Sequence, residues 1–530
     1  MNWREVIPGV YRYRDSCNVY AVQGSEGMLL IDAGTGRWLD HLSELPAAPA
    51  ALALTHYFRD HAAGAVPAAA RGIPVYVPEH ERAVLADPGQ HFRARETYVI
   101  YDNLWNLFAP IEPVAVAGLL RDYDRMRLAG LEVEVIPLPG CTLTQVGLGV
   151  LLPGSDRPVV FCGEAIHSPG RVPRVAPFQY NYNDMSGAGN AWYSARSLGR
   201  REPAALLPSL GEPILEDTGG ALGRLEENLT ALLAPYRYGD PGPPGRLEKV
   251  TDHVYLDTDS GSNNWFVVSD SGKALVIDYG YFSSPFGSAF PGYSSPPNRR
   301  PLLHGLEALE RQFGIDRIDV ALISHFHDDH VCGLPLLQRL FDTEVWAAEN
   351  FADLIAHPEA HCFPCNWHQP ARVDRRIRLD EEVEWEEYRF RFAPMSGHTR
   401  FASLIGFEAD GMRFAHTGDQ YFFDGDFRNW SENQRMQNHV YRNGALLDGY
   451  EESGRWMLEW RPQVVIQGHQ PPFFTDDDFF AHIEKWREDY ETLHRNLMPL
   501  GEEEVHFDLD SWGGWIWPYR VHLAEPGPAR

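Results

Sequence analysis

The segment ALISHFHDDH, residues 321–330, places an apolar run directly before a group of three histidines and two aspartates. The run predicts a buried strand, and the polar residues fall in the loop at its end. Alternate residues His325 and His327 would turn toward one point, while Asp329 and His330 would face a second point nearby. Histidines packed this closely repel one another when charged, so packing alone is a poor explanation for the cluster. We therefore expect a metal centre with two adjacent cation positions.

Three further residues extend this cluster, and each follows a strand-like run and a glycine. They are His398 in MSGHT, Asp419 in HTGDQ and His469 in IQGHQPP. Glycine allows a sharp turn and close backbone approach, as a loop that delivers one metal ligand requires. His416, just before the second of these turns, is a candidate either for packing or for supporting a ligand.

With these motifs, residues 250–475 resemble the metallo-β-lactamase superfamily, and among its members the hydroxyacylglutathione hydrolases and zinc-dependent lactonases. The resemblance implies an αββα sandwich that holds two metal ions. Its implied ligands are, for the first ion, His325, His327 and His398; for the second ion, Asp329, His330 and His469; and, bridging the two, Asp419. The donor set suits Zn²⁺ first, with Fe²⁺ or Mn²⁺ as alternatives.

Two such ions would lower the pKa of a shared water, so that a bridging hydroxide attacks a polarised carbonyl. Asp329 is placed to orient that hydroxide, and Asp419 to bridge the ions, so these two aspartates are the predicted catalytic residues. The resemblance implies hydrolysis of a small-molecule ester, thioester or lactone. A mononuclear iron enzyme similar to persulfide dioxygenases and a non-catalytic binding or scaffold protein are the alternatives, and a nuclease is a poorer one.

The chain also contains an internal repeat. The stretch from Gly9 to Gly36 reads like that from His253 to Gly280, with Asp32 matching Asp278. Each stretch predicts a pair of strands joined by a turn. Downstream, THYFRDH in the first half matches SHFHDDH in the second half. Strands alternate with amphipathic segments, which indicates α/β layers, so we expect two tandem αββα sandwiches.

The first half has lost part of the ligand set. His56, Asp60 and His61 remain, whereas Phe58 replaces the second histidine. The later ligand positions are occupied by Cys141, Glu164 and Leu210 or a neighbour. Two interpretations stay open: a degenerate copy without metal, and a single residual ion on His56, Asp60, His61 and Glu164.

The predicted domains are residues 1–240, residues 246–475 and residues 476–530. The first boundary lies at YGDPGPPG, a Pro- and Gly-rich linker from Tyr238 to Gly245. The third region begins with one long helix over Asp476 to Met498. It ends in a tail whose aromatic residues we expect to pack on the second domain: Trp512, Trp515, Trp517 and Tyr519.

Two other segments carry less specific signals. HCFPCNWH contains His361, Cys362, Cys365 and His368, for which a pocket-lining loop, a structural zinc site and a redox pair are the interpretations. The insertion from Tyr281 to Arg300, rich in Ser, Pro and aromatic residues, fits a lid or a solvated excursion.

Composition excludes several functional classes. The 530 residues include 46 Lys and Arg against 74 Asp and Glu, a net charge of −28, which repels nucleic acid. No stretch is apolar enough to span a membrane, and no secretory signal is recognisable, so we expect a cytoplasmic protein without a membrane partner. Six scattered cysteines do not form a disulfide scaffold. The expected partner is a small-molecule substrate, and a monomer and a homodimer are both compatible with the sequence.

Overall fold

The apolar run Val320–Ile323 forms strand β17, in which every side chain is buried. Strand β17 pairs in parallel with β16 (Ala274–Ile277) on one side and with β18 (Glu344–Ala348) on the other. Central parallel strands are apolar throughout because layers cover both of their faces. The segment HFHDDH thus starts at the carboxyl end of a central strand.

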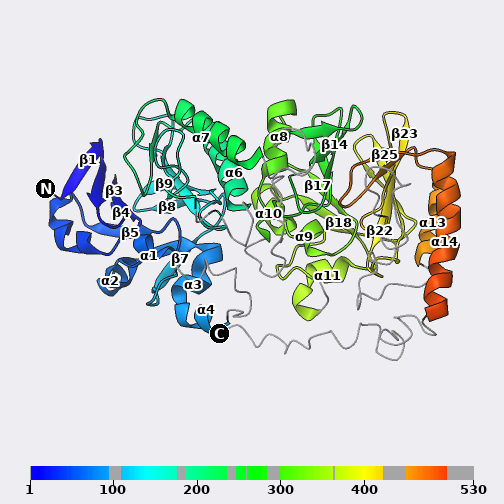
Figure 1. Cartoon of the computed structure of the whole chain (residues 1–530), viewed down its shortest axis with the longest axis horizontal. Helices are drawn as coiled ribbons and strands as arrows, with labels where there is room; N and C mark the ends of the chain where they lie inside the picture. Colours follow the sequence, from blue (N-terminus) through cyan, green and yellow to red (C-terminus); the bar gives the residue numbers. More distant parts are fainter. Residues whose placement is uncertain are drawn as a thin grey trace. The chain divides into compact units, whose positions relative to one another are not determined.

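The computed structural model describes residues 2–94, 109–175, 178, 186–234, 246–257, 259–282, 299–361, 365–421 and 449–497. These residues form two compact units, residues 2–234 and residues 246–497 (Figure 1). The linker Tyr238–Gly245, most of the insertion Tyr281–Arg300 and the tryptophan-rich tail lie outside the described residues.

The second unit contains two sheets within its described residues. The first has the order β13 (Leu247–Lys249), β14 (Val254–Asp257), β15 (Asn264–Val268), β16, β17, β18 and β19 (Arg375–Ile377). The second has the order β20 (Glu382–Trp385), β21 (Tyr388–Pro394), β22 (Ser403–Ala409), β23 (Met412–His416), β24 (Val464–Ile466) and β25 (Phe473–Phe474). The helices are α8 (His304–Phe313), α9 (Asp328–Val331), α10 (Leu334–Phe341), α11 (Ala352–Ala356), η6 (Pro358–Ala360), α13 (Gly449–Trp460) and α14 (Asp477–Leu497).

The first unit has a similar pair of sheets. One has the order β1 (Trp3–Ile7), β2 (Val10–Arg14), β3 (Asn18–Gly24), β4 (Gly27–Ile31), β5 (Pro49–Ala53), β6 (Val75–Pro78) and β7 (Val116–Leu120). The other has the order β12 (Ala205–Leu207), β11 (Val159–Phe161), β10 (Val146–Val150), β9 (Leu131–Pro137) and β8 (Arg125–Leu128). The helices are η1 (Arg37–Glu44), α1 (Arg59–Ala62), α2 (Ala65–Ala70), η2 (Glu79–Glu81), α3 (Arg82–Ala86), α4 (Pro88–Ala94), α6 (Ser186–Arg200) and α7 (Thr218–Leu233).

Strand directions agree between the units. In each first sheet, four antiparallel strands are followed by three parallel additions. In each second sheet, four antiparallel strands are followed by one parallel strand, and the second unit adds β25. Each repeated stretch forms three antiparallel strands, whereas the sequence predicted two.

The core of the first unit lies between its two sheets. Alternate residues of a strand share one face, and Leu29 and Ile31 of β4 enter the same apolar cluster as Val133 and Val135 of β9. Residues from both sheets therefore build one core, as in a sandwich. The predicted mixed α/β sandwich fold is confirmed.

In the second unit, helices α13 and α14 pack side by side against the second sheet (Figure 1). The sequence predicts a helix over Asp476–Met498, and α14 spans Asp477–Leu497. Asp476 Oδ1 accepts the backbone N–H of Phe479 at 3.0 Å, which satisfies a free donor of the first turn. Phe479 and Ile483 are buried in the cluster that joins α14 to the sheet.

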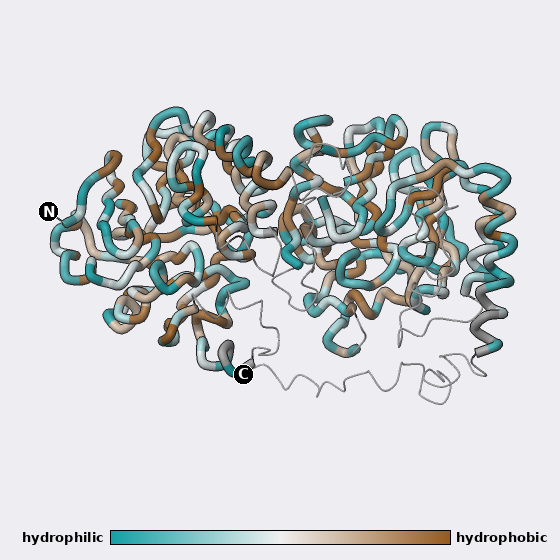
Figure 2. The backbone as a smooth tube through the Cα atoms, in the orientation of Figure 1, coloured by the Kyte–Doolittle hydropathy of each residue, from teal (hydrophilic) through white to brown (hydrophobic). Residues whose placement is uncertain are grey.

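Hydropathy follows this layering. Brown, hydrophobic stretches run along the inner strands of each unit, and teal, hydrophilic stretches occupy outer turns (Figure 2). Among the described residues, no helix is long and apolar enough to cross a membrane.

Candidate metal centre

The loop after β17 carries four of the seven predicted site residues. His325 forms an isolated bridge with Ala402, and His327 forms one with Asn366, so the loop is held on both sides. Helix α9 then places Asp329 and His330 one turn further on. Asp328, the remaining acid of the segment, forms an ion pair with Arg299.

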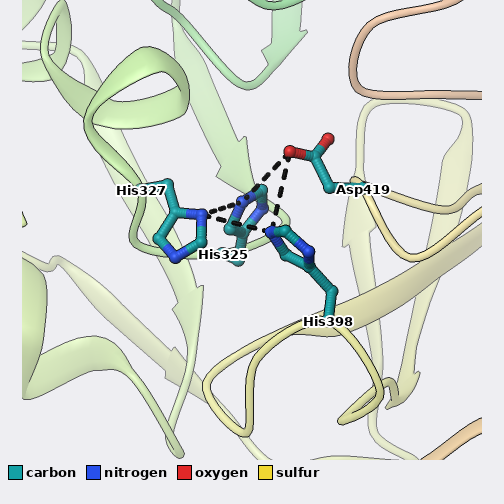
Figure 3. Close-up of side chains that lie close together, drawn as sticks. All are labelled: His325, His327, His398 and Asp419. Atoms are coloured by element: carbon teal, nitrogen blue, oxygen red, sulfur yellow. Dashed lines mark hydrogen bonds and ion pairs between the residues drawn. The ribbon is translucent and has the colours of Figure 1, made fainter. Parts of the chain in front are cut away.

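The first group of side chains comprises His325, His327, His398 and Asp419, whose potential ligand atoms all lie within 4.8 Å of one another. His327 Nδ1 lies 3.1 Å from His325 Nε2 and 3.2 Å from His398 Nε2. Figure 3 shows the three rings and the Asp419 carboxylate turned toward one another. Their ring nitrogens face other nitrogens at hydrogen-bond distance, an arrangement suited to a shared cation.

The second group comprises Asp329, His330, Asp419 and His469. His469 Nε2 lies 3.1 Å from Asp329 Oδ2 and 3.2 Å from Asp419 Oδ2. His330 Nε2 lies 3.3 Å from the same Asp419 oxygen. The structure thus brings all seven predicted residues together, and Asp419 belongs to both groups.

Turns after three strands of the second sheet deliver the distant residues. His398 follows β21, Asp419 follows β23 and His469 follows β24. Gly418 has a φ of +47°, a left-handed conformation that glycine adopts without strain. A Cβ at Gly468 would lie 1.8 Å from Asp419 Oδ1, so any side chain there would displace the carboxylate.

Burial and nearby charges shift the pKa values of two histidines of the site in opposite directions. Burial, together with the nearby His398, lowers the pKa of His327 to about 3. Burial also opposes the charge of His469, but the carboxylate of Asp419 prevails and raises the pKa of His469 to about 10. Since neutral imidazole is the ligating form, His327 is ready to bind a cation, whereas His469 must first release a proton.

Asp278 is a residue of the site that the sequence did not identify. It follows β16 with a φ of +60° and accepts hydrogen bonds from His330 Nδ1 at 2.8 Å and from Ser324 Oγ at 2.6 Å. Carboxylates in this position orient a ligating histidine and increase its basicity. The internal repeat could have identified Asp278, because Asp32 occupies the matching position after β4 with a φ of +57°.

His416 lies at the end of β23 and is completely buried. Its Nε2 is 3.8 Å from Asp278 Oδ2, and its Nδ1 lies 3.3 Å from the Gly418 amide nitrogen. His416 therefore contacts the carboxylate behind the site and the turn that carries Asp419, and it belongs to neither ligand group.

In the first unit, His56, His61 and Glu164 form a smaller group. Phe58 is buried and packs edge-to-face against His56, with ring centroids 5.0 Å apart, so an apolar ring occupies the position of the missing ligand. Cys141 donates its thiol to Gln145 Oε1 at 3.0 Å and does not join the group. Leu210 is partly buried.

The cysteine-containing loop is described only in part, because Cys362 lies outside the described residues. Cys365 is a free, exposed cysteine. Among the described side chains, no ligand group includes His361, Cys365 or His368.

Comparison with known proteins matches two stretches of the chain, residues 12–209 and 257–492, to the metallo-β-lactamase superfamily. Uncharacterised proteins of Mycobacterium tuberculosis and Mycobacterium bovis are each 30% identical over 161 residues, which cover 28% of this chain and 68% of each relative.

Solved structures of the same superfamily are also similar. A subclass B3 metallo-β-lactamase of Bradyrhizobium japonicum is 17% identical, with a TM-score of 0.35 over 44% of this chain and 94% of that one. A metallo-β-lactamase family protein from Thermus thermophilus is 20% identical, with a TM-score of 0.32 over 45% and 85%. A class B3 di-zinc metallo-β-lactamase from an Alaskan soil metagenome is 13% identical, with a TM-score of 0.33 over 48% and 96%.

The two matched stretches make up more than half of the chain. The chain therefore belongs to the metallo-β-lactamase superfamily, a family of metallo-hydrolases.

Proposed function

We propose that the second unit hydrolyses a small-molecule ester, thioester or lactone with the help of two divalent metal ions, most readily Zn²⁺. One observation carries the proposal: a single oxygen, Asp419 Oδ2, lies within 3.2–3.8 Å of a nitrogen of each of four histidines. Those nitrogens belong to His325, His330, His398 and His469. A carboxylate oxygen so placed can serve two ligand groups at once.

The side chains fit such ions chemically. The other carboxylate oxygen, Asp419 Oδ1, is buried and has no hydrogen-bond partner, and an unpaired buried carboxylate oxygen is costly. Nitrogen and carboxylate donors together suit Zn²⁺, Fe²⁺ and Mn²⁺. Ions held by these side chains would supply hydroxide at neutral pH and polarise a carbonyl oxygen.

The protein side chains would orient the reactants. The side chains of Asp329 and His469 are 21% and 23% exposed, whereas those of His325 and His330 are fully buried. Substrate therefore reaches the site from the side of Asp329 and His469. There Asp329 Oδ2 orients the attacking water by accepting its hydrogen bond, and the buried histidines keep bulk water from the opposite side.

The preference for an ester, thioester or lactone rests on the resemblance to hydroxyacylglutathione hydrolases and lactonases. The net charge of −28 supports a small substrate over a nucleic acid. We further propose that the two units arose by tandem duplication and that the first has lost the dinuclear site, since Phe58 stands where the second unit has His327.

The test compares wild type with His327→Ala and, as a matched control, with His357→Ala, an exposed histidine of the same unit. Metal content is measured by mass spectrometry, and hydrolysis is measured with a panel of esters, thioesters and lactones. We expect zinc on the second unit and turnover in wild type and control. In His327→Ala we expect loss of the second-unit zinc and at least a hundredfold loss of kcat/KM. A single iron per chain with oxygen consumption on a persulfide would favour the dioxygenase instead. A second unit that binds no metal would overturn the proposal.

A further inference from the structure

The group in the first unit is small, buried and convergent. His56 Nε2 and His61 Nε2 each lie 3.7 Å from Glu164 Oε1. Both histidines have no exposed surface, and Glu164 is 2% exposed. Neither Nε2 atom has a hydrogen-bond partner, although buried polar atoms normally have one. Two imidazole nitrogens and a carboxylate oxygen thus face a common point.

The opposite edge of each imidazole is fixed. Thr55 Oγ1 donates to Asp32 at 2.9 Å and lies 2.9 Å from His56 Nδ1, so it accepts the Nδ1 hydrogen. His61 Nδ1 lies 3.0 Å from Asp60 Oδ1 and donates to it. In its neutral form, a histidine whose Nδ1 carries the proton presents a lone pair at Nε2, as metal-ligating histidines do. Burial opposes the charge of His61, but Asp60 and Glu164 prevail and raise its pKa to about 9, so His61 releases a proton when it binds an ion.

We propose that the first unit binds one divalent transition-metal ion through His56 Nε2, His61 Nε2 and the Glu164 carboxylate. Because Phe58 replaces the next histidine, the described residues of this unit do not repeat the three-histidine group of the second unit. Ligand type favours Zn²⁺, Co²⁺, Fe²⁺ or Mn²⁺. Asp60 supports His61 from behind rather than ligating, which revises the residual four-residue set considered from the sequence.

Arg174 sets the strength of this site. Its Nη2 donates to Glu164 Oε1 at 2.7 Å and lies 3.6 Å from Asp60 Oδ2. A carboxylate oxygen has lone pairs for both an arginine and an ion. The positive charge of the guanidinium offsets one of the two negative charges of Glu164 and Asp60. The first unit therefore binds its ion more weakly than the second unit.

The experiment uses the full chain with His327→Ala and Asp419→Ala, which remove donors of both groups in the second unit. Co²⁺ is titrated into this background, and binding is followed by visible d–d absorption. We expect about one Co²⁺ per chain, lost on adding Glu164→Gln. Adding Glu134→Gln is the matched control, because Glu134 pairs with Arg201 elsewhere in the unit, and it should leave Co²⁺ binding unchanged.

Arg174→Gln in the same background should tighten Co²⁺ binding about tenfold, since it removes a like charge beside the ion. Circular dichroism verifies folding, and His61→Gln replaces Glu164→Gln as the ligand variant if the latter does not fold. Three outcomes would each overturn the proposal. The background protein binds no Co²⁺, a folded ligand variant still binds Co²⁺, or Co²⁺ binds only after Arg174→Gln is added. The site is independent of the proposed hydrolysis, because the background already lacks second-unit ligands.

Discussion

Asp278 holds His330 through its ring nitrogen and Ser324 through its hydroxyl. Asp278→Asn keeps the shape but removes the charge that orients and polarises His330. We expect metal affinity of the second unit to fall by about 10- to 100-fold, measured by competition with a chelator. Asp410→Asn, at the pair with His253, is the control and should leave affinity unchanged. An unchanged affinity in Asp278→Asn would show that His330 is fixed by packing alone.

The substitution Gly468→Ala tests by steric displacement whether Asp419 bridges the two ligand groups. In Gly468→Ala, the new methyl group would meet Asp419 Oδ1, so the carboxylate must move and both ligand groups lose their common oxygen. The methyl group would also lie 2.8 Å from the backbone oxygen of Gly418, so that turn must shift as well. We expect at least a hundredfold loss of hydrolysis, and circular dichroism verifies that the variant folds. Gly223→Ala on α7, where an added Cβ meets nothing within 4 Å, should retain full activity and gain up to about 1 kcal/mol of stability. An active Gly468→Ala enzyme would rule out the bridging role.

Helix α14 illustrates what an element-level pattern can predict. Acidic residues at its start and apolar residues at helical spacing located it to within a residue at each end. In Ile483→Ala, loss of the buried side chain that joins α14 to the second sheet should reduce the free energy of unfolding by about 2–4 kcal/mol, measured by urea denaturation. Lys485→Ala, on the exposed side, should change it by about 0.5 kcal/mol or less. Equal effects would mean that α14 does not contribute to the core.

A buried ion pair links α8 to β14 and makes stability depend on pH. His304 Nδ1 lies 2.8 Å from Asp257 Oδ2; burial opposes the charge, but Asp257 prevails and raises the pKa of His304. The pair therefore stabilises fully below the unfolded pKa of about 6.5 and loses its effect as pH rises through the raised folded value. We expect His304→Gln to cost about 3 kcal/mol at about pH 6 and less at about pH 9.

Urea denaturation at both pH values tests this, with the exposed His357→Gln as control. A cost for His304→Gln that is independent of pH would show that His304 is neutral in the folded protein.

The sequence predicted the elements better than their connections through space. The apolar run before His325 identified β17, and glycine turns identified the loops that carry His398, Asp419 and His469. Asp278 escaped notice because its role depends on tertiary packing, in which strand β16 is brought beside β17. The contact of Arg174 with Glu164 likewise depends on how a loop folds, and no local sequence pattern predicts it.

At the scale of the whole molecule, each unit has its own sheets and apolar cluster. We expect two calorimetric transitions, each of which moves to lower temperature on chelation, with the larger shift in the transition of the second unit. An ion at about a thousandfold its Kd contributes about 4 kcal/mol to the unit that binds it. In His327→Ala, the chelator should shift that transition much less than in wild type. One transition with no response to chelator would contradict both independence of the units and metal binding.

The position of Asp419 Oδ2 between four histidine nitrogens has a thermodynamic consequence. Because two ions would share one oxygen, neither site can be filled without altering the other. A first ion would order the carboxylate that a second ion needs, yet it would also withdraw electron density from that carboxylate and repel the second ion. Linkage makes the balance reciprocal, so the affinity of each position depends on which element occupies its neighbour. Mixed-metal forms of this protein should therefore differ from the average of the two pure forms.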